Sequence, residues 1–139
     1  VKVAESQRRL LEAALKAMNN AYVIWGFRVG AAVSAEDCQV YEGCNIESWI
    51  SGLGLCAERC AITHAVLHGN RKIEKMAIVM DIDNQSEPMP CGACLQYIHD
   101  FAKNPKIEIV MAKVKNGRIL FETVKVKTVE ELLPFPFKK

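Results

Sequence analysis

Two short stretches place thiols and a carboxylate at spacings that could hold a metal ion and move protons. The first is LCAE at 55–58, which carries Cys56 and Glu58, and the second is PCGAC at 90–94, which carries Cys91 and Cys94. Because residues three apart share one face of a helix, Cys91 and Cys94 point to the same side of a helix's first turn. Three thiolates on Zn²⁺ leave one of its four positions open, which is the layout of a catalytic rather than a structural zinc site.

Both stretches stand where a helix is predicted to begin. The residue pattern predicts helices over 56–68 and 91–102. The free N–H groups and the dipole of a helix start lower the pKa of a thiol, and the thiolate is the form that binds metal. Glu58, two residues after Cys56, can then move protons for a water molecule at the open zinc position.

Spacing alone leaves other interpretations open. Cys60 lies four residues after Cys56 on the same helix face, so it could complete a structural zinc site with four Cys ligands. The Cys-x-x-Cys pair could be a redox pair, although no thioredoxin-like context with a preceding Trp surrounds it. The thiols could also be unrelated buried residues, as we expect for Cys38 and Cys44.

The composition excludes several classes of protein. The 139 residues are 50% hydrophobic, which suffices for one core and predicts a single domain over 1–139. A net charge of +2 that is spread along the chain is not typical of a nucleic-acid binder. No apolar run has membrane-spanning length, and no signal-peptide pattern is found. Six cysteines without such a signal predict reduced or metal-bound thiols in a cytoplasmic protein.

The remaining elements predict an α/β fold that positions these residues. A helix is predicted over 6–18 with Ser6 as its N-cap, and Thr128 with Glu131 forms a capping box for a short helix. Strands are predicted at 27–34, 39–43, 75–82, 106–114 and 118–126. This order predicts a mixed five-stranded sheet with helices on both faces. The Asn116-Gly117 turn is too short for a crossover, so the last two strands are expected to be antiparallel.

These motifs together resemble the zinc-dependent cytidine deaminases. The CAER segment at 56–59 with PCGAC at 90–94 matches the signature of zinc deaminases. Three further segments, FRVGAAV at 27–33, YEGCNIE at 41–47 and ELLPFPF at 131–137, resemble segments of the family in the right order. The resemblance covers most of the chain and implies a three-layer α/β/α fold of the cytidine deaminase type.

The resemblance also implies a role for each matched residue near the metal. Cys56, Cys91 and Cys94 are expected to hold one Zn²⁺ per subunit, and Glu58 to take a proton from water and pass protons to N3 and the departing amine. Arg59 is expected to donate a hydrogen bond to a ligand sulfur. The implied reaction is hydrolytic deamination of cytidine or 2′-deoxycytidine to the uridine nucleoside with release of ammonia, a step of pyrimidine salvage.

Five further residues are expected to bind the nucleoside. Asn45 and Glu47 would hydrogen-bond the ribose 3′-hydroxyl, because a hydroxyl both donates and accepts. The Ala57 backbone N–H would meet the base carbonyl, and Phe27 and Phe137 would pack on the base. In the family the C-terminal Phe reaches a neighbouring subunit of a homotetramer, so a homotetramer is expected, with a small-molecule substrate and neither nucleic acid nor membrane as partner.

The chain departs from the family's pattern around the substrate. Ile24-Trp25-Gly26 stands where the family has Pro-Tyr-Ser, in a loop one residue shorter, and Trp49 replaces a small Ala. Leu95 replaces an Arg that follows the last zinc ligand. These differences leave open a modified or antibiotic cytosine nucleoside of the blasticidin S type. A non-catalytic module stabilised by zinc is a third hypothesis, against which Glu58 argues.

Overall fold

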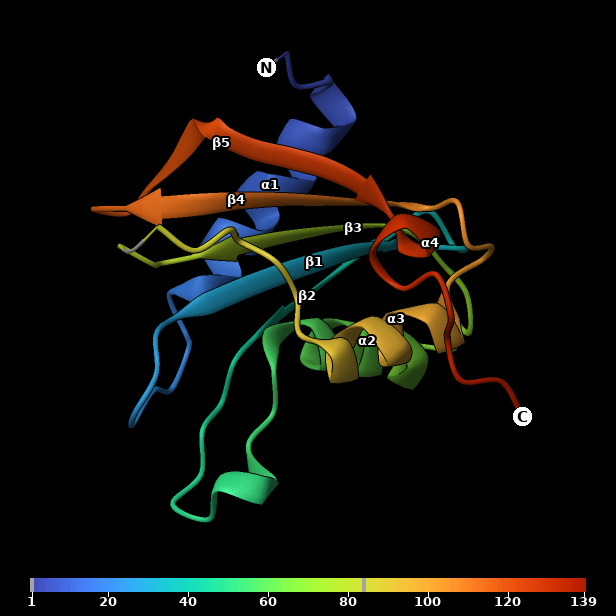
Figure 1. The fold of residues 1–139 in the computed structure, drawn as a ribbon, viewed down its shortest axis with the longest axis horizontal. Coiled ribbons are helices and arrows are strands. Elements are labelled where there is room, and N and C mark those ends of the chain that lie inside the picture. Colours follow the sequence, from blue (N-terminus) through green and yellow to red (C-terminus); the bar gives the residue numbers. More distant parts are fainter. Residues whose placement is uncertain (1, 84) are drawn as a thin grey trace.

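The computed structural model describes residues 2–83 and 85–139 (Figure 1). Along these residues run α1 (Glu5–Met18), β1 (Val29–Ala35), β2 (Val40–Cys44), the 3₁₀ turn η1 (Ser51–Leu53), α2 (Ala57–Leu67), β3 (Ile73–Met80), α3 (Gly92–Phe101), β4 (Glu108–Lys115), β5 (Arg118–Thr128) and α4 (Val129–Leu132).

The strands of the described residues form one five-stranded mixed sheet in the order β2-β1-β3-β4-β5. β1 runs antiparallel to both β2 and β3, β3 and β4 are parallel, and β4 and β5 are antiparallel. The parallel pair is joined through α3, whereas the antiparallel β4–β5 pair is joined by Asn116 and Gly117, whose φ angles are 53° and 74°. Such positive φ values suit a tight hairpin turn, and the predicted antiparallel arrangement is confirmed.

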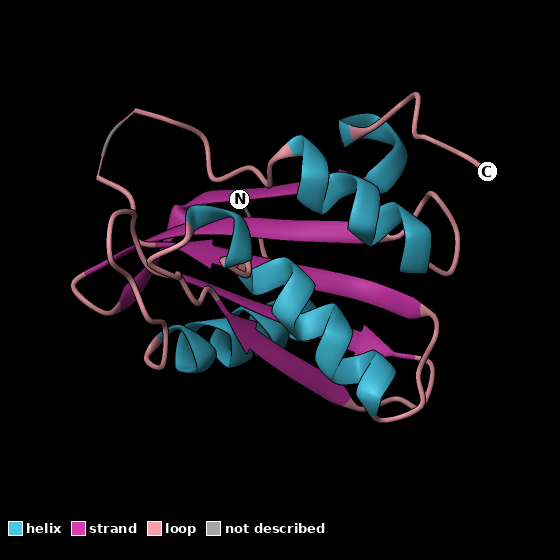
Figure 2. Ribbon diagram, turned by 90° about the horizontal axis from the view of Figure 1, so that it is seen from below, coloured by secondary structure: helices cyan, strands magenta, loops and turns pink. Residues whose placement is uncertain are grey.

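Helices cover both faces of the sheet. α1 packs on one face, and α2 and α3 pack on the other (Figure 1 and Figure 2). β1, β3 and β4 carry almost continuous apolar runs because both of their faces are buried. The predicted three-layer α/β/α fold is thereby confirmed.

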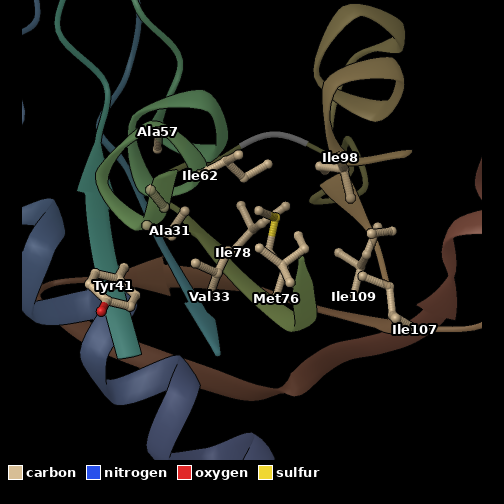
Figure 3. Close-up of a cluster of buried hydrophobic side chains, with 14 of the residues drawn as sticks. Ala31, Val33, Tyr41, Ala57, Ile62, Met76, Ile78, Ile98, Ile107 and Ile109 are labelled. Carbon is tan, nitrogen blue, oxygen red and sulfur yellow. The ribbon is translucent and has the colours of Figure 1, made fainter. Parts of the chain in front are cut away.

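The larger core cluster lies between the sheet and the pair α2 and α3 (Figure 3). Ile62 of α2 and Ile98 of α3 are fully buried against β3 residues Met76 and Ile78. This packing fixes the two helices beside each other, and therefore fixes where their N-terminal ends lie.

One predicted helix start is wrong and another is confirmed. α1 begins one residue before the predicted helix, and the N-cap is Ala4, whose N–H donates to Gln7 Oε1 at 3.0 Å. Ser6 lies inside the first turn, where its hydroxyl accepts from Lys75 Nζ at 3.4 Å. The capping box of α4 is present as predicted, because the Glu131 N–H donates to Thr128 Oγ1 and the Thr128 N–H donates to Glu131 Oε1.

Within the described part of the chain, none of the helices combines the length and apolar character that crossing a membrane requires.

Candidate active site

The starts of α2 and α3 lie side by side at one end of the sheet. Cys56 is the N-cap of α2 and Cys91 is the N-cap of α3, both with extended backbone. Cys94 lies in the first turn of α3, and Glu58 lies in the first turn of α2. The sequence prediction that these four residues stand at two helix starts is confirmed.

β2 determines how closely α2 approaches the sheet. A Cβ on Gly43 would lie 2.3 Å from the Ala61 backbone nitrogen and 2.6 Å from the Ala57 carbonyl oxygen. Only glycine permits this contact, so the α2 backbone rests directly on β2. The first turn of α2, with Ala57 and Glu58, is therefore held rigidly.

A cavity of about 250 Å³ opens at these helix starts. Its volume lies just below the range for small-molecule sites, roughly 300–1,000 Å³. Its lining includes the three predicted metal ligands, Glu58, and the predicted substrate residues other than Phe137. The full set of lining residues is Gly26, Phe27, Val29, Asn45, Glu47, Cys56, Ala57, Glu58, Met80, Met89, Cys91 and Cys94.

The three cavity thiols interact with one another and with Arg59. The Cys56 thiol is hydrogen-bonded to Cys94 and Cys91, and Arg59 Nη2 donates to Cys56 Sγ at 3.3 Å. The hydrogen bond with Cys94, supported by the Arg59 guanidinium, lowers the pKa of Cys56 to about 5. The same bond, together with burial, raises the pKa of Cys94. Cys56 is thus held as a thiolate.

This donor set fits a zinc ion. Among residues 2–83 and 85–139, no group of three His, Cys, Asp or Glu side chains is already arranged to hold a metal ion, so the fit concerns the chemistry of the donors. Three soft sulfur donors, one of them ionised, are the ligands that select zinc. Arg59 Nε is buried with no hydrogen-bond partner among the described residues, so the cation beside the sulfurs has donor capacity left for a more negative cluster.

The other cysteines lie apart from this cluster. Cys60 and Cys44 line a separate hollow between α1, β2 and α2, where burial, with Cys60 nearby, raises the pKa of Cys44. Cys60 does not line the main cavity, which disfavours a site with four Cys ligands. Cys44 is half-buried, and Cys38, which was expected to be buried, is exposed in the turn between β1 and β2 with φ of 64°.

Glu58 is a carboxyl group buried in the cavity wall. Only 4% of its surface is exposed, and burial raises its pKa above the ordinary value. A buried carboxyl with a raised pKa accepts and returns a proton more readily near neutral pH than an exposed one does.

Asn45 and Glu47 also line the cavity, and their polar atoms bind backbone groups of the chain. Asn45 Oδ1 accepts from the Val29 N–H at 2.9 Å, and Asn45 Nδ2 donates to the Phe27 carbonyl at 2.8 Å. Glu47 accepts from backbone N–H groups of residues 24–26. Spacing in the sequence gave no sign of these contacts, because the partners lie about twenty residues away.

Phe137 is a predicted substrate-binding residue that does not line the cavity. Its side chain is 76% exposed, while its backbone is fixed to α3, with its N–H donating to Gln96 Oε1 at 2.9 Å and its carbonyl accepting from Gln96 Nε2 at 3.0 Å. Leu95, one residue after Cys94, is buried in the core, so this position faces away from solvent.

Met80 and Met89 are cavity residues that the sequence did not indicate. Met80 is the last residue of β3, and Met89 precedes the Pro-Cys motif. Their positions at a strand end and beside a predicted ligand are the only signals that could have identified them.

Comparison with known proteins places the chain among deaminases. The model of the "Cytidine and deoxycytidylate deaminase zinc-binding region" matches residues 4–112. The chain is 37% identical over 132 residues to the cytidine deaminase of Sporosarcina psychrophila, covering 94% of this chain and 90% of that one. It is 27% identical to the blasticidin-S deaminase of Bacillus cereus over 99% of this chain and 96% of that one. The crystal structure of the cytidine deaminase from Burkholderia pseudomallei matches with a TM-score of 0.82 and 33% identity, covering 97% of this chain and 100% of that one.

Proposed function

The chain belongs to the cytidine and deoxycytidylate deaminase zinc-binding family, and from this we propose that it hydrolyses cytidine and 2′-deoxycytidine to the uridine nucleosides and ammonia. The observation that carries this proposal is the cavity in which a buried Glu58 lies with the three thiols of Cys56, Cys91 and Cys94.

We assign the zinc ligands to Cys56, Cys91 and Cys94. Bound there, one Zn²⁺ supplies Lewis-acid activation of a water molecule. Arg59 donates to Cys56 Sγ, which offsets part of the negative charge of three thiolates and orients that ligand. The two helix N-termini stabilise the same charge through their free N–H groups.

Glu58 is the proton carrier in this proposal. Its carboxylate takes one proton from the attacking water and delivers it to N3 as the water oxygen bonds to C4, then takes the second proton from that oxygen and delivers it to the exocyclic nitrogen, so that the C4–N bond breaks and ammonia leaves. Burial supports this role, because it raises the pKa of Glu58 and so makes the protonated form accessible during turnover.

The base is held from two sides. Ala57 is the first residue of α2, so its backbone N–H has no carbonyl partner within the helix and can donate to the carbonyl oxygen of the base. Phe27 lines the cavity and is 46% exposed, which leaves one side of its ring available for packing on the base. Asn45 and Glu47 contribute the polar atoms nearest the sugar side.

The electrostatics of the cavity favour a nucleoside over a nucleotide. Among the described residues that line it, none is Lys, Arg or His, whereas Glu47 and Glu58 are both present. A phosphate dianion at this position would face carboxylates without a compensating cation. We therefore propose a neutral nucleoside as the substrate.

A cytosine nucleoside antibiotic is the second candidate. The match to a blasticidin-S deaminase over nearly the whole chain supports it, and so does Trp49, whose large side chain replaces a small one near the sugar side. Retention of Asn45 and Glu47 supports the ordinary nucleosides more strongly.

We also propose a homotetramer in which Phe137 enters a neighbour's cavity. The supporting observation is that Phe137 is exposed yet held in place by Gln96, away from its own cavity. We further propose that residues 1–139 form a single domain and that the protein acts in pyrimidine salvage in the cytoplasm. The free state of all six cysteines, which the structure describes, is consistent with a reducing compartment.

A substrate panel tests the reaction. The zinc-loaded protein is assayed for ammonia release from cytidine, 2′-deoxycytidine, deoxycytidylate, free cytosine and blasticidin S. We expect turnover of the first two and little of deoxycytidylate. Turnover of blasticidin S alone would establish the second candidate, and release from none of them would overturn the proposal.

A further inference from the structure

The carboxylate of Glu47 is enclosed by three successive backbone N–H groups. Those of Ile24 and Trp25 donate to Oε1 at 2.5 and 2.6 Å, and that of Gly26 donates to Oε2 at 3.1 Å. These bonds, first that from Trp25, lower the pKa of Glu47, so the group is ionised at neutral pH. A ring of consecutive N–H groups is a typical anion-binding arrangement, here filled by the protein's own side chain.

The bonds from Glu47 are part of a larger set of hydrogen bonds between segments 22–29 and 45–47, which form one wall of the cavity. The Tyr22 N–H donates to the Asn45 carbonyl at 3.0 Å, and the Glu47 N–H donates to the Tyr22 carbonyl at 2.8 Å. Asn45 then holds Val29 and Phe27 through its side-chain amide. Segment 22–29 is therefore held by segment 45–47 at both ends, and between them Glu47 binds the backbone of 24–26.

Gly26 packs closely against this carboxylate. A Cβ at position 26 would lie 2.7 Å from Glu47 Oε2, a distance that forces the carboxylate or the loop to move. Gly52, by comparison, lies in the neighbouring η1 turn with no atom within 4 Å of such a Cβ. The chain thus offers a sensitive glycine and an insensitive one in the same region.

The same loop brings together both tryptophans of the chain. Trp25 and Trp49 meet edge to face, with ring centroids 6.1 Å apart and an interplanar angle of 86°. Near-ultraviolet circular dichroism of tryptophan therefore reports on this contact.

We propose that Glu47 is a positioning residue, which holds the loop 24–26 by its backbone and thereby keeps Phe27 against the cavity, whether or not the substrate carries a sugar hydroxyl. This inference rests on the proposed deaminase function and adds a role beyond ribose binding. Glu47 Oε1 is shared by the N–H groups of Ile24 and Trp25, so the carboxylate serves the loop before any ligand arrives.

The experiment compares two substrates that differ in one oxygen atom. Glu47→Gln keeps the shape of the side chain but places an NH₂ group against backbone donors. Its kcat/KM is measured on cytidine and on 3′-deoxycytidine, which lacks only the 3′-hydroxyl. We expect KM to rise on both substrates, by on the order of 10- to 100-fold on 3′-deoxycytidine, where no 3′-hydroxyl contact can be lost, because misplacement of a binding wall costs about that much.

Glycine variants give a second arm that does not depend on Glu47 itself. Gly26→Ala is expected to raise KM on both substrates and to reduce the near-ultraviolet tryptophan signal. Gly52→Ala, the matched control, is expected to leave both unchanged. Zinc content and melting temperature are recorded for every variant, so that unfolding is recognised.

The outcomes separate this inference from the proposed function. If the parent protein deaminates neither substrate, the proposed function fails, and the tryptophan signal of Glu47→Gln and Gly26→Ala still decides the anchoring role. A loss for Glu47→Gln that is confined to cytidine, with an unchanged tryptophan signal, would show that Glu47 acts only through the 3′-hydroxyl and would overturn the inference.

Discussion

The two walls of the cavity are held in place by different means. On one wall, Cys56 and Cys91 cap two helices whose positions are fixed by a fully buried apolar core. On the other wall, segment 22–29 is held mainly through hydrogen bonds from its backbone to Asn45 and Glu47. The first wall, formed by Cys56, Cys91 and Cys94 and called the thiol wall below, is positioned by packing. The second, formed by segment 22–29 and called the loop wall below, is positioned by polar side chains.

This difference shows that some residues lining the cavity hold the backbone in place, whereas others leave their polar atoms available to a ligand. The thiols face the cavity and bond chiefly to one another, so their chemistry is available to a ligand. The polar atoms of Asn45 and Glu47 are already bonded to backbone groups. Changes in the thiol wall should therefore abolish chemistry without altering the loop, whereas changes in the loop wall should alter substrate binding.

The thiol wall gives the largest expected effect. Cys91→Ser removes one of three sulfur donors and is expected to lose both bound zinc and turnover. Cys60→Ser is the matched control, because Cys60 lies outside the cavity, and it is expected to keep both. Metal analysis with an ammonia-release assay checks the pair. Equal zinc loss from Cys60→Ser would restore the structural site with four Cys ligands.

Leu95 tests whether the core behind the thiol wall tolerates charge. Leu95→Arg would bury a cation without a partner and is expected to lower the free energy of unfolding by about 3–5 kcal/mol. Leu95→Met, which preserves volume, should cost less than about 1.5 kcal/mol. Urea unfolding measures both. A stable Leu95→Arg protein would mean that this side chain reaches solvent or the sulfurs.

Removal of the C-terminal tail tests whether Phe137 of one subunit lines the cavity of a neighbouring subunit. Deleting 135–139 is expected to raise KM for cytidine roughly 2- to 10-fold, which corresponds to the about 0.5–1.5 kcal/mol of an aromatic contact. Phe135→Ala is the control, because Phe135 is not fixed by Gln96. A fully active truncated protein, or a strict monomer in light scattering, would contradict the proposed role of Phe137.

Acid should loosen the loop wall gradually. The pKa of Glu47 is lowered from its ordinary value of 4.5, so the stabilisation is complete above that pH and is lost as pH falls through the lower native pKa. The near-ultraviolet tryptophan signal is expected to stay constant from pH 7 to 5 and to decline below 4.5. In Glu47→Gln the signal should no longer depend on pH in this range.

Local rules predicted the thiol wall and most of the fold. The Cys spacings, the helix starts and the Asn116-Gly117 hairpin each depend on neighbours within a few residues, and all are present. Thr128 capped its helix as predicted, whereas Ser6 did not, because the helix begins earlier, with Ala4 as the N-cap and the Ala4 N–H donating to Gln7 Oε1. The prediction that Cys38 is buried was wrong, because the apolar character of a side chain does not show that the residue lies in an exposed turn with positive φ.

The hydrogen bonds of the loop wall could not be predicted from patterns among neighbouring residues. The resemblance identified Asn45 and Glu47 as polar site residues, but their bonds to 24–29 join segments about twenty residues apart. Leu95 and Phe137 were identified by position alone, and only the structure distinguishes a buried core residue from an exposed one.

The most direct test of the account is the turnover of Glu58→Ala with its zinc measured in the same sample. Because Glu58 moves protons and is not assigned as a ligand, the variant is expected to keep its zinc and fold while kcat for cytidine falls about 10²- to 10⁴-fold. Near-normal kcat in a folded, zinc-loaded Glu58→Ala protein would contradict the account.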